Sequence, residues 1–111
     1  MPTFAMLTTL SPAGGQTLHQ HPDRLKDVDE ETKVMGCRVV AQYALLGRFD
    51  FLTIIEAPDA ETMAHLSVDL ASRGTAHFET MQALPLEPFI EKLKSHEQLG
   101  RGEIQADQRQ A

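Results

Sequence analysis

Asp50 is the acidic residue of this sequence with the clearest potential for chemistry. In the strand pairing predicted below, it shares one sheet face with Leu52 and Ile54, so apolar groups partly enclose its carboxylate. An enclosed carboxylate needs a hydrogen-bond or charged partner, or it takes up a proton. Asp50 is therefore a candidate catalytic residue, acting as a general base, or an anchor for a ligand in a pocket. The structural alternative is that Asp50 orders the hairpin while Arg48 points to solvent.

Arg24 is the candidate for binding an acidic group. It stands one residue before the apolar Leu25, early in a predicted helix. A guanidinium group can hold a carboxylate with two parallel hydrogen bonds. It can equally pair with Asp27 or Glu31 on the helix surface, where such a pair contributes only a few tenths of a kcal/mol. The other residues that we assign to a ligand-binding pocket are Arg48 and three aromatic residues, Tyr43, Phe49 and Phe51.

The histidines and the cysteine do not form a metal motif. The tripeptide His19-Gln20-His21 offers two imidazoles, whereas zinc needs three or four ligands. His65, His77 and Cys37 fall on separate predicted elements, so we predict no metal site. No base is readable beside Cys37, which we interpret as an inert, semi-buried thiol. We also expect no organic cofactor, because the sequence has no phosphate-binding loop, dinucleotide-binding glycine pattern or nucleophile elbow.

The composition excludes several classes of protein. The chain has 111 residues, enough for one domain, and 41% of them are hydrophobic. The formal net charge of −6 has the wrong sign for a general nucleic-acid binder. No run of about 18 apolar residues predicts a membrane span, and the start lacks a basic segment followed by an apolar one. The single cysteine fits a reducing compartment, so we expect a cytoplasmic protein.

The first half of the chain predicts a strand and then a helix. Residues 2–10 are rich in β-tolerant types, and the segment 11–15, with two glycines and a proline, is expected to end the strand. Pro22 is suited to the first position of a helix, and Gly36 to the position just after its end. Between them, one narrow stripe is expected to be buried: Leu25, Val28, Thr32 and Met35.

The middle of the chain predicts a hairpin. Its strands are expected at 37–46 and 49–57, joined by a two-residue turn at Gly47-Arg48 of type II′. This turn pairs Leu45 with Asp50, Tyr43 with Leu52, and Ala41 with Ile54, all on one sheet face. The residues expected on the other face are Val40, Ala44, Phe49, Phe51 and Ile55.

The second half predicts a helix, a strand and a short helix. The helix opens at Pro58-Asp59, buries Met63, Leu66 and Leu70, and ends at Gly74. A strand at 75–84 and a short helix holding Phe89, Ile90 and Leu93 follow. We assign residues 1–94 to one domain. Residues 95–111 contain few large apolar side chains, so we expect them to form a polar, mobile tail.

The order of these elements predicts the architecture. Strand, helix, strand, strand, helix, strand is the split βαβ pattern of the ferredoxin-like fold, an α+β fold with an antiparallel four-stranded sheet. Two helices cover only one face of such a sheet, yet the predicted hairpin is apolar on both faces. A monomer would leave a contiguous apolar patch in water. We therefore predict that the chain pairs with itself, sheet to sheet, as a homodimer or a higher homo-oligomer.

Several residues, taken in one register, resemble the GYD-domain family, which is named for a Gly-Tyr-Asp signature in its central hairpin. The resemblance runs from Met1 to about Leu84. The matching residues are Met1-Pro2-Thr3, Gly14, Pro22, Arg24, Gly36, Gly47-Arg48, Asp50, Glu56-Ala57-Pro58-Asp59, Gly74, Glu79-Thr80 and Ala83. The sequence departs from the family pattern at Phe49, which replaces the signature tyrosine, and at Gly15 and His21.

The resemblance implies the dimeric α/β-barrel superfamily. That superfamily includes cofactor-free monooxygenases, muconolactone isomerases and amino-acid-responsive regulators, while the GYD family itself has no well-established activity. Fold does not decide function. From the residues we predict a cytoplasmic homodimer that binds a small organic molecule in a pocket between sheet and helices. The alternatives are a cofactor-free monooxygenase-like or isomerase-like enzyme with Asp50 as its base, and a module whose faces serve only oligomerisation.

Overall fold

The computed structural model describes residues 1–95, so the tail predicted at 95–111 lies outside the described residues except for Ser95. Four antiparallel strands form one sheet in the order β2-β3-β1-β4. This is the predicted ferredoxin-like α+β fold. The elements, in chain order, are β1 (Thr3–Leu10), α1 (Pro12–Gln20), the 3₁₀ helix η1 (Pro22–Lys26), α2 (Asp27–Val34), β2 (Arg38–Ala44), β3 (Phe51–Glu56), α3 (Ala60–Ala71), β4 (Ala76–Ala83) and α4 (Leu86–Lys94).

The central hairpin has the predicted register but a wider loop. Tyr43 pairs with Leu52 and Ala41 with Ile54, as predicted. The Leu45 N–H donates to the Asp50 carbonyl at 2.9 Å, which continues the same register. The strands nevertheless end at Ala44 and restart at Phe51, earlier and later than predicted. The prediction of strands reaching a two-residue turn is therefore wrong, although the pairing it implied is right.

A β-bulge in β2 changes which valine faces the helices. The register shifts between Val39 and Ala41, so that Val39, rather than Val40, lies opposite the buried Ile55. Val39 packs against the core, whereas Val40 is exposed. The placement of Val40 on the face of Ile55 is thus corrected. A bulge inserts one residue into one strand, and simple alternation cannot reveal it.

Helix α1 occupies most of the segment 11–15, which was expected only to end the first strand. The Ser11 hydroxyl caps its start by accepting a hydrogen bond from the Gly14 N–H at 3.0 Å. Gly14 lies so close to β4 that an added Cβ would come within 2.0 Å of the Thr75 carbonyl oxygen. A glycine is needed at this position because α1 approaches the backbone of Thr75 closely, and not because the helix ends there. The single helix predicted from Pro22 is also divided, into η1 and α2.

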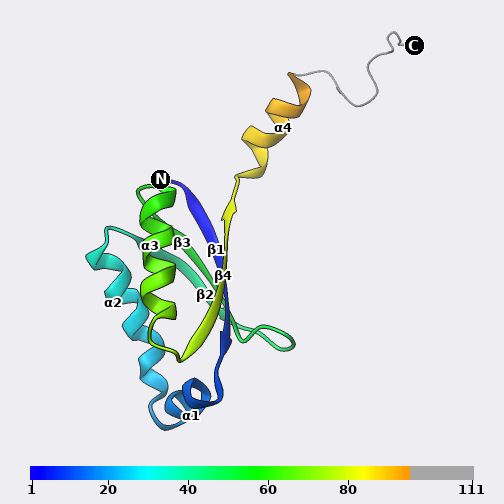
Figure 1. The fold of residues 1–111 in the computed structure, drawn as a ribbon. Coiled ribbons are helices and arrows are strands. Elements are labelled where there is room, and N and C mark those ends of the chain that lie inside the picture. The colour runs from blue at the N-terminus through cyan, green and yellow to red at the C-terminus, as the bar shows by residue number, and fades with distance from the viewer. Residues whose placement is uncertain (96–111) are drawn as a thin grey trace.

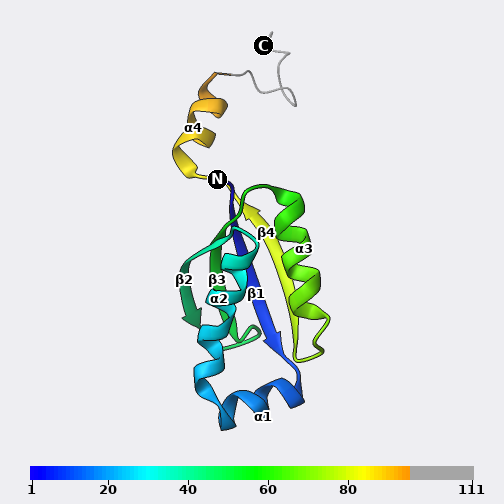
Figure 2. The same ribbon diagram turned by 90° about the vertical axis from the view of Figure 1, so that its left-hand side faces the viewer.

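Helices α1, α2 and α3 lie on one side of the sheet. In Figure 1 the sheet is seen nearly edge-on with α1, α2 and α3 on the same side, and Figure 2 shows α2 and α3 in front of the strands. Thr32 of α2 is fully buried, as predicted. The apolar core lies between these layers and consists of Phe4, Met6, Cys37, Ile55, Ala57, Met63, Leu66 and Leu70.

The opposite face of the sheet has no helix over it in the part of the chain that the structure describes (Figure 1). The strand pairing places alternate apolar residues there, with Leu7 opposite Leu52 and Ala5 opposite both Ile54 and Met81. We call this surface the bare sheet face. Its apolar residues are Ala5, Leu7, Ala41, Tyr43, Leu52, Ile54 and Met81.

Helix α4 extends beyond the end of β4 and stands clear of the sheet and of the other helices in both views (Figures 1 and 2). It follows β4 after only Leu84 and Pro85. None of the helices in residues 1–95 is long and apolar enough to span a membrane.

Candidate functional site

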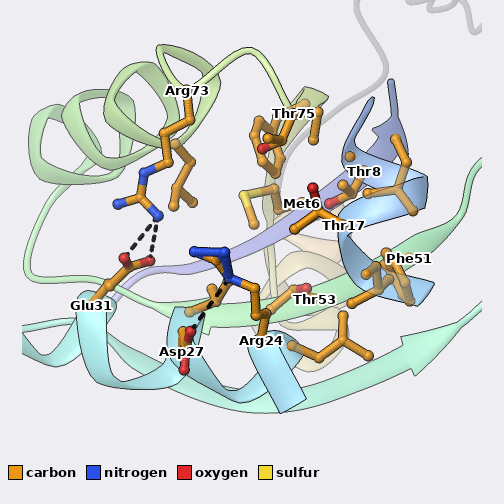
Figure 3. Close-up of a pocket in the computed structure, with 18 of the residues that line it drawn as sticks. Met6, Thr8, Thr17, Arg24, Asp27, Glu31, Phe51, Thr53, Arg73 and Thr75 are labelled. Carbon is orange, nitrogen blue, oxygen red and sulfur yellow. Dashed lines mark hydrogen bonds and ion pairs between the residues drawn. The ribbon is translucent and has the colours of Figure 1, made fainter. Parts of the chain in front are cut away.

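A cavity of about 310 Å³ lies between the sheet and the helices, under α1, η1 and α2 (Figure 3). The strands contribute its floor, the first three helical segments its walls, and the end of α3 its far side. Apolar side chains dominate these surfaces, with a few polar groups among them. The lining residues are Met6, Thr8, Leu10, Gly14, Thr17, Leu18, Arg24, Leu25, Asp27, Val28, Glu31, Gln42, Phe51, Thr53, Leu70, Arg73, Thr75, Ala76 and Phe78.

Two buried threonines on the floor have hydroxyl groups without a partner. Thr8 of β1 is 7% exposed and Thr53 of β3 is 3% exposed. Both line the cavity, and neither hydroxyl makes a hydrogen bond to any described residue. Leaving a buried polar group unpaired costs about 1–3 kcal/mol. The floor therefore has a hydrogen-bonding capacity that residues 1–95 do not satisfy.

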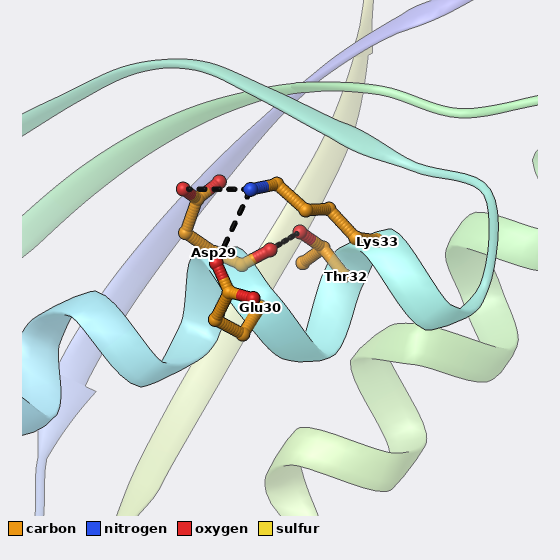
Figure 4. A network of polar contacts seen from close by, with 4 residues as sticks. All are labelled: Asp29, Glu30, Thr32 and Lys33. Carbon is orange, nitrogen blue, oxygen red and sulfur yellow. Dashed lines mark hydrogen bonds and ion pairs between the residues drawn. The ribbon is translucent and has the colours of Figure 1, made fainter.

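The other buried threonine shows the contrast. The hydroxyl of Thr32 donates to the Asp29 carbonyl at 2.9 Å, within the polar network that Figure 4 shows on α2. In the same network Lys33 lies 3.2 Å from Glu30 and 3.8 Å from Asp29. Those carboxylates raise the pKa of the Lys33 ammonium group. Thr32 and Lys33 of α2 are thus paired locally, unlike the hydroxyls of Thr8 and Thr53.

Charged groups form the rim of the cavity. Arg73, just after α3, binds Glu31 of α2 with Nη1 at 2.7 Å and 2.9 Å from the two carboxylate oxygens. Arg24 of η1 is held more loosely, with its Nε 4.0 Å from an Asp27 oxygen and its side chain 59% exposed (Figure 3). Most donors of the Arg24 guanidinium group therefore stay available to an acidic ligand.

The structure brings two of the predicted site residues together. Arg24 and Phe51 both line the cavity. Tyr43 lies on the bare sheet face and is 56% exposed. Arg48 and Phe49 lie in the hairpin loop, where the guanidinium carbon stands 5.1 Å from the centre of the phenyl ring. The cavity therefore contains Arg24 and Phe51 but not Tyr43, Arg48 or Phe49.

Asp50 ties the hairpin to the end of β1. Its Oδ2 accepts a hydrogen bond from the Leu10 N–H at 2.7 Å, and its own N–H donates to the Thr8 carbonyl at 2.7 Å. Asp50 is not among the residues that line the cavity. This is the arrangement expected from the structural interpretation of Asp50.

Sequence reasoning missed several lining residues. The predicted register already places Gln42 opposite Thr53, and the structure confirms that pairing on the side that faces the helices. Two polar residues facing each other on a buried side were a readable signal. Thr8 alternates with the buried Phe4 and Met6 and gave the same signal. The pairing of Arg73 with Glu31 had no local signal, because 42 residues separate them.

The other reactive side chains do not converge on the cavity. Among residues 1–95, no three histidine, cysteine or acidic side chains lie close enough to hold a metal ion. Cys37 is buried in the core rather than semi-buried, and burial, with a smaller effect of Asp59, raises the pKa of its thiol. A raised pKa keeps the thiol protonated and poorly nucleophilic.

A four-stranded antiparallel sheet with helices on one side, and a cavity between the two layers, defines a ferredoxin-like α+β protein. The chain belongs to the GYD domain family, whose model matches residues 4–93. It is 46% identical over 95 residues to the glutamine synthetase and cystathionine beta-lyase binding protein of Thermus thermophilus, covering 85% of this chain and 100% of that protein.

Two solved structures share the fold at low sequence identity. The leucine response regulatory protein LrpA of Mycobacterium tuberculosis is 14% identical with a TM-score of 0.54, and the match covers 76% of this chain and 51% of that one. TTHA0845, also from Thermus thermophilus, is 17% identical with a TM-score of 0.51, and the match covers 77% of this chain and 95% of that one. This chain thus spans about half the length of the leucine response regulatory protein.

Proposed function

We propose that this chain is a cytoplasmic, homodimeric binding protein that holds a small organic molecule in the cavity under α1, η1 and α2. The observation that carries the proposal is the pair of buried hydroxyls of Thr8 and Thr53 on the cavity floor, which no residue among 1–95 meets with a hydrogen bond. A ligand that reaches the floor with a hydroxyl, carbonyl or amide group gains hydrogen bonds that the protein alone leaves unmade. The cavity also favours binding over a module whose faces serve only assembly.

The walls and the rim define the ligand further. Phe51 and Phe78 on the floor side and Leu18 and Leu25 on the helix side offer apolar contact to the body of a ligand. Arg24 at the rim offers hydrogen bonds to a carboxylate. The ligand expected from this arrangement is a small organic acid with an apolar body and a second polar group at its other end.

The bare sheet face supports the homodimer. Tyr43 and Met81 are exposed there, and Leu7, Leu52 and Ile54 are only partly buried. A contiguous apolar surface of this kind is typical of an interface. Pairing two copies through this face would cover both apolar surfaces by a symmetric contact.

The Thermus thermophilus relative that is 46% identical to this chain favours a second candidate function, the binding of enzymes. That protein is named for binding glutamine synthetase and cystathionine beta-lyase, and its similarity to this chain extends over its whole length. We propose that this chain also binds an enzyme of these kinds. Surface plasmon resonance with the two enzymes from this protein's own organism tests this candidate. Binding of neither enzyme at micromolar concentration would contradict it.

Native mass spectrometry of the protein purified from its own organism tests the first candidate. The expected result is a dimer that carries a bound molecule of low mass. Thr53→Val removes one floor hydroxyl without changing the side-chain shape, and we expect it to weaken retention about tenfold, as loss of one hydrogen bond to a buried partner does. Without ligand, the same change is expected to stabilise the protein by about 1 kcal/mol.

Thr9→Val is the matched control, because Thr9 is the next residue of β1 and points to the opposite face. It should alter neither ligand retention nor the stability of the ligand-free protein. A dimer that carries no molecule, together with equal stabilities of the Thr53→Val and Thr9→Val proteins, would overturn the ligand proposal.

A further inference from the structure

Helix α4 carries an apolar stripe that faces solvent. Its four large apolar residues are spaced three, one and three positions apart, which places them on one side of the helix. All four are between 38% and 67% exposed. The polar residues Glu87, Glu91 and Lys94 occupy other positions of the helix. We call Leu86, Phe89, Ile90 and Leu93 the α4 stripe.

A helix of this length needs a packing partner. α4 has nine residues, and Pro85 at its start provides no side-chain hydrogen bond to cap it. Isolated helices shorter than about 12–15 residues are marginal in water, and packing of an apolar face normally supplies the missing stability. The α4 stripe is therefore expected to be covered in the working protein.

Two residues, Leu84 and Pro85, connect β4 to α4, and we call them the joint. The joint directs α4 away from its own sheet. The ring of Pro85 fixes its φ, here −57°, and its ψ of 137° is extended. The residue before a proline is also restricted to extended conformations, which applies to Leu84. The chain runs onward past the end of β4 before α4 begins, as both ribbon views show (Figures 1 and 2). To turn back over the sheet of its own chain, α4 would need a different backbone conformation at Leu84-Pro85.

The uncovered surfaces of α4 and of the sheet are continuous along the chain. β4 lies at the sheet edge, and its Met81 belongs to the bare sheet face. The exposed Leu84 follows at the joint, and the α4 stripe comes next. One chain thus presents two apolar surfaces, a sheet face and a helix stripe, and the joint separates them. Two copies related by a twofold axis can cover both, because each copy then supplies a helix to the other.

We infer that α4 is an arm that packs against the bare sheet face of a second copy of this chain. The inference rests on the homodimer proposed above and assigns its contact to exchanged helices, so that each α4, and not the partner's sheet, covers Leu52 and Ile54 of the bare sheet face. Phe89 and Leu93 are the contacts in the second half of the arm. The sheet-side contacts are the apolar residues of β3 on the bare face, Leu52 and Ile54.

The test combines sedimentation, to measure dimer affinity, with amide hydrogen exchange of residues 86–94. The double variant Phe89→Asp/Leu93→Asp is expected to raise the dimer dissociation constant by about 100-fold or more, since two apolar contacts are replaced by charges. Leu52→Asp on the sheet is expected to weaken the dimer similarly and, in the resulting monomer, to expose the α4 amides to exchange. Val68→Asp is the control, because Val68 is an exposed apolar residue on α3, and it should change neither quantity.

The outcomes separate this inference from the proposed homodimer. If the wild type is a dimer that Leu52→Asp weakens but Phe89→Asp/Leu93→Asp does not, the sheet-to-sheet dimer stands and the exchange of arms is overturned. If the α4 amides stay protected in the Leu52→Asp monomer, α4 packs on its own chain and the inference is again overturned. A monomeric wild type overturns both. Circular dichroism confirms that each variant is folded.

Discussion

The two faces of the sheet depart from ordinary burial in opposite ways. On the side covered by helices, Thr8 and Thr53 are enclosed and their hydroxyls have no partner in residues 1–95. On the bare side, Tyr43 and Met81 are apolar and exposed. A folded chain gains nothing from either arrangement by itself. The proposed ligand would supply the missing polar contact on one face, and the proposed second copy would supply the missing apolar contact on the other.

The largest expected effect comes from a substitution at the closest backbone contact on the helix-covered side of the sheet, between Gly14 and Thr75. In Gly14→Ala the new methyl group would lie 2.0 Å from the Thr75 carbonyl oxygen, so backbone must move. We expect a loss of about 2–4 kcal/mol in the free energy of unfolding, measured by urea denaturation.

Gly15→Ala is the matched control for that prediction. Nothing lies within 4 Å of its added Cβ, and both residues belong to α1. Alanine is the better helix former, so we expect Gly15→Ala to be neutral or to stabilise by up to about 1 kcal/mol. Equal effects at the two positions would show that α1 does not approach β4 as described.

Two aromatic residues on paired strands sharpen the comparison between the faces. Phe51 lines the cavity and Tyr43 lies on the bare sheet face. Phe51→Ala is expected to reduce the stability of the fold by about 2 kcal/mol, because it removes partly buried apolar contacts. Tyr43→Ala is expected to leave the stability of the subunit nearly unchanged and to weaken the dimer about tenfold. Thermal unfolding and sedimentation measure the two effects, and a reversed pattern would refute the assignment of the faces.

Asp50→Asn tests whether this carboxylate serves the hairpin or a ligand. The amide keeps the size of the side chain but weakens the hydrogen bond from the Leu10 N–H. We expect a loss of about 1 kcal/mol in stability and no change in ligand retention, because Asp50 does not line the cavity. Loss of ligand with unchanged stability would return Asp50 to the candidate site.

The smallest expected effect is the response of Cys37 to alkaline pH. Burial raises the pKa of this thiol in the folded protein, so the folded state holds its proton more tightly than the unfolded state. The corresponding stabilisation is fully present below the ordinary thiol pKa of about 8.5 and is lost as pH rises through the higher folded value. The difference in unfolding free energy between wild type and Cys37→Ala should therefore shrink as pH rises above the ordinary thiol pKa of about 8.5. A constant difference would contradict it.

The fold was largely predictable because the elements that define it have strong local patterns. The apolar spacing of α3 and the hairpin register around Tyr43 and Leu52 both hold in the structure. Helix α1 was missed because adjacent glycines usually break helices, whereas Gly14 is required by its closeness to Thr75. That closeness depends on a contact between distant parts of the chain, which no local pattern contains.

The candidate site was predictable only in part. Arg24 was a candidate because it lies early in a predicted helix beside an apolar residue, and Phe51 because it is an aromatic residue of the predicted hairpin; both line the cavity. The hydroxyls of Thr8 and Thr53 matter because no partner meets them, and a missing partner is a property of the folded arrangement. Alternation along β2 places Tyr43 on the same sheet face as Leu52. It does not tell whether the helices cover that face or the opposite one, so the position of Tyr43 away from the cavity could not be predicted.

The hydrogen bonds between Ser11 and Thr75 have a consequence for how the protein is made. The N–H of Ser11 donates to the Thr75 carbonyl at 3.0 Å, and its hydroxyl donates to the same oxygen at 3.1 Å. Contacts between residues so far apart in sequence form slowly, since a long loop must close first. A nascent chain that has not yet released β4 from the ribosome therefore lacks one wall of the cavity, and the cavity is complete only after Thr75, Ala76 and Phe78 have emerged.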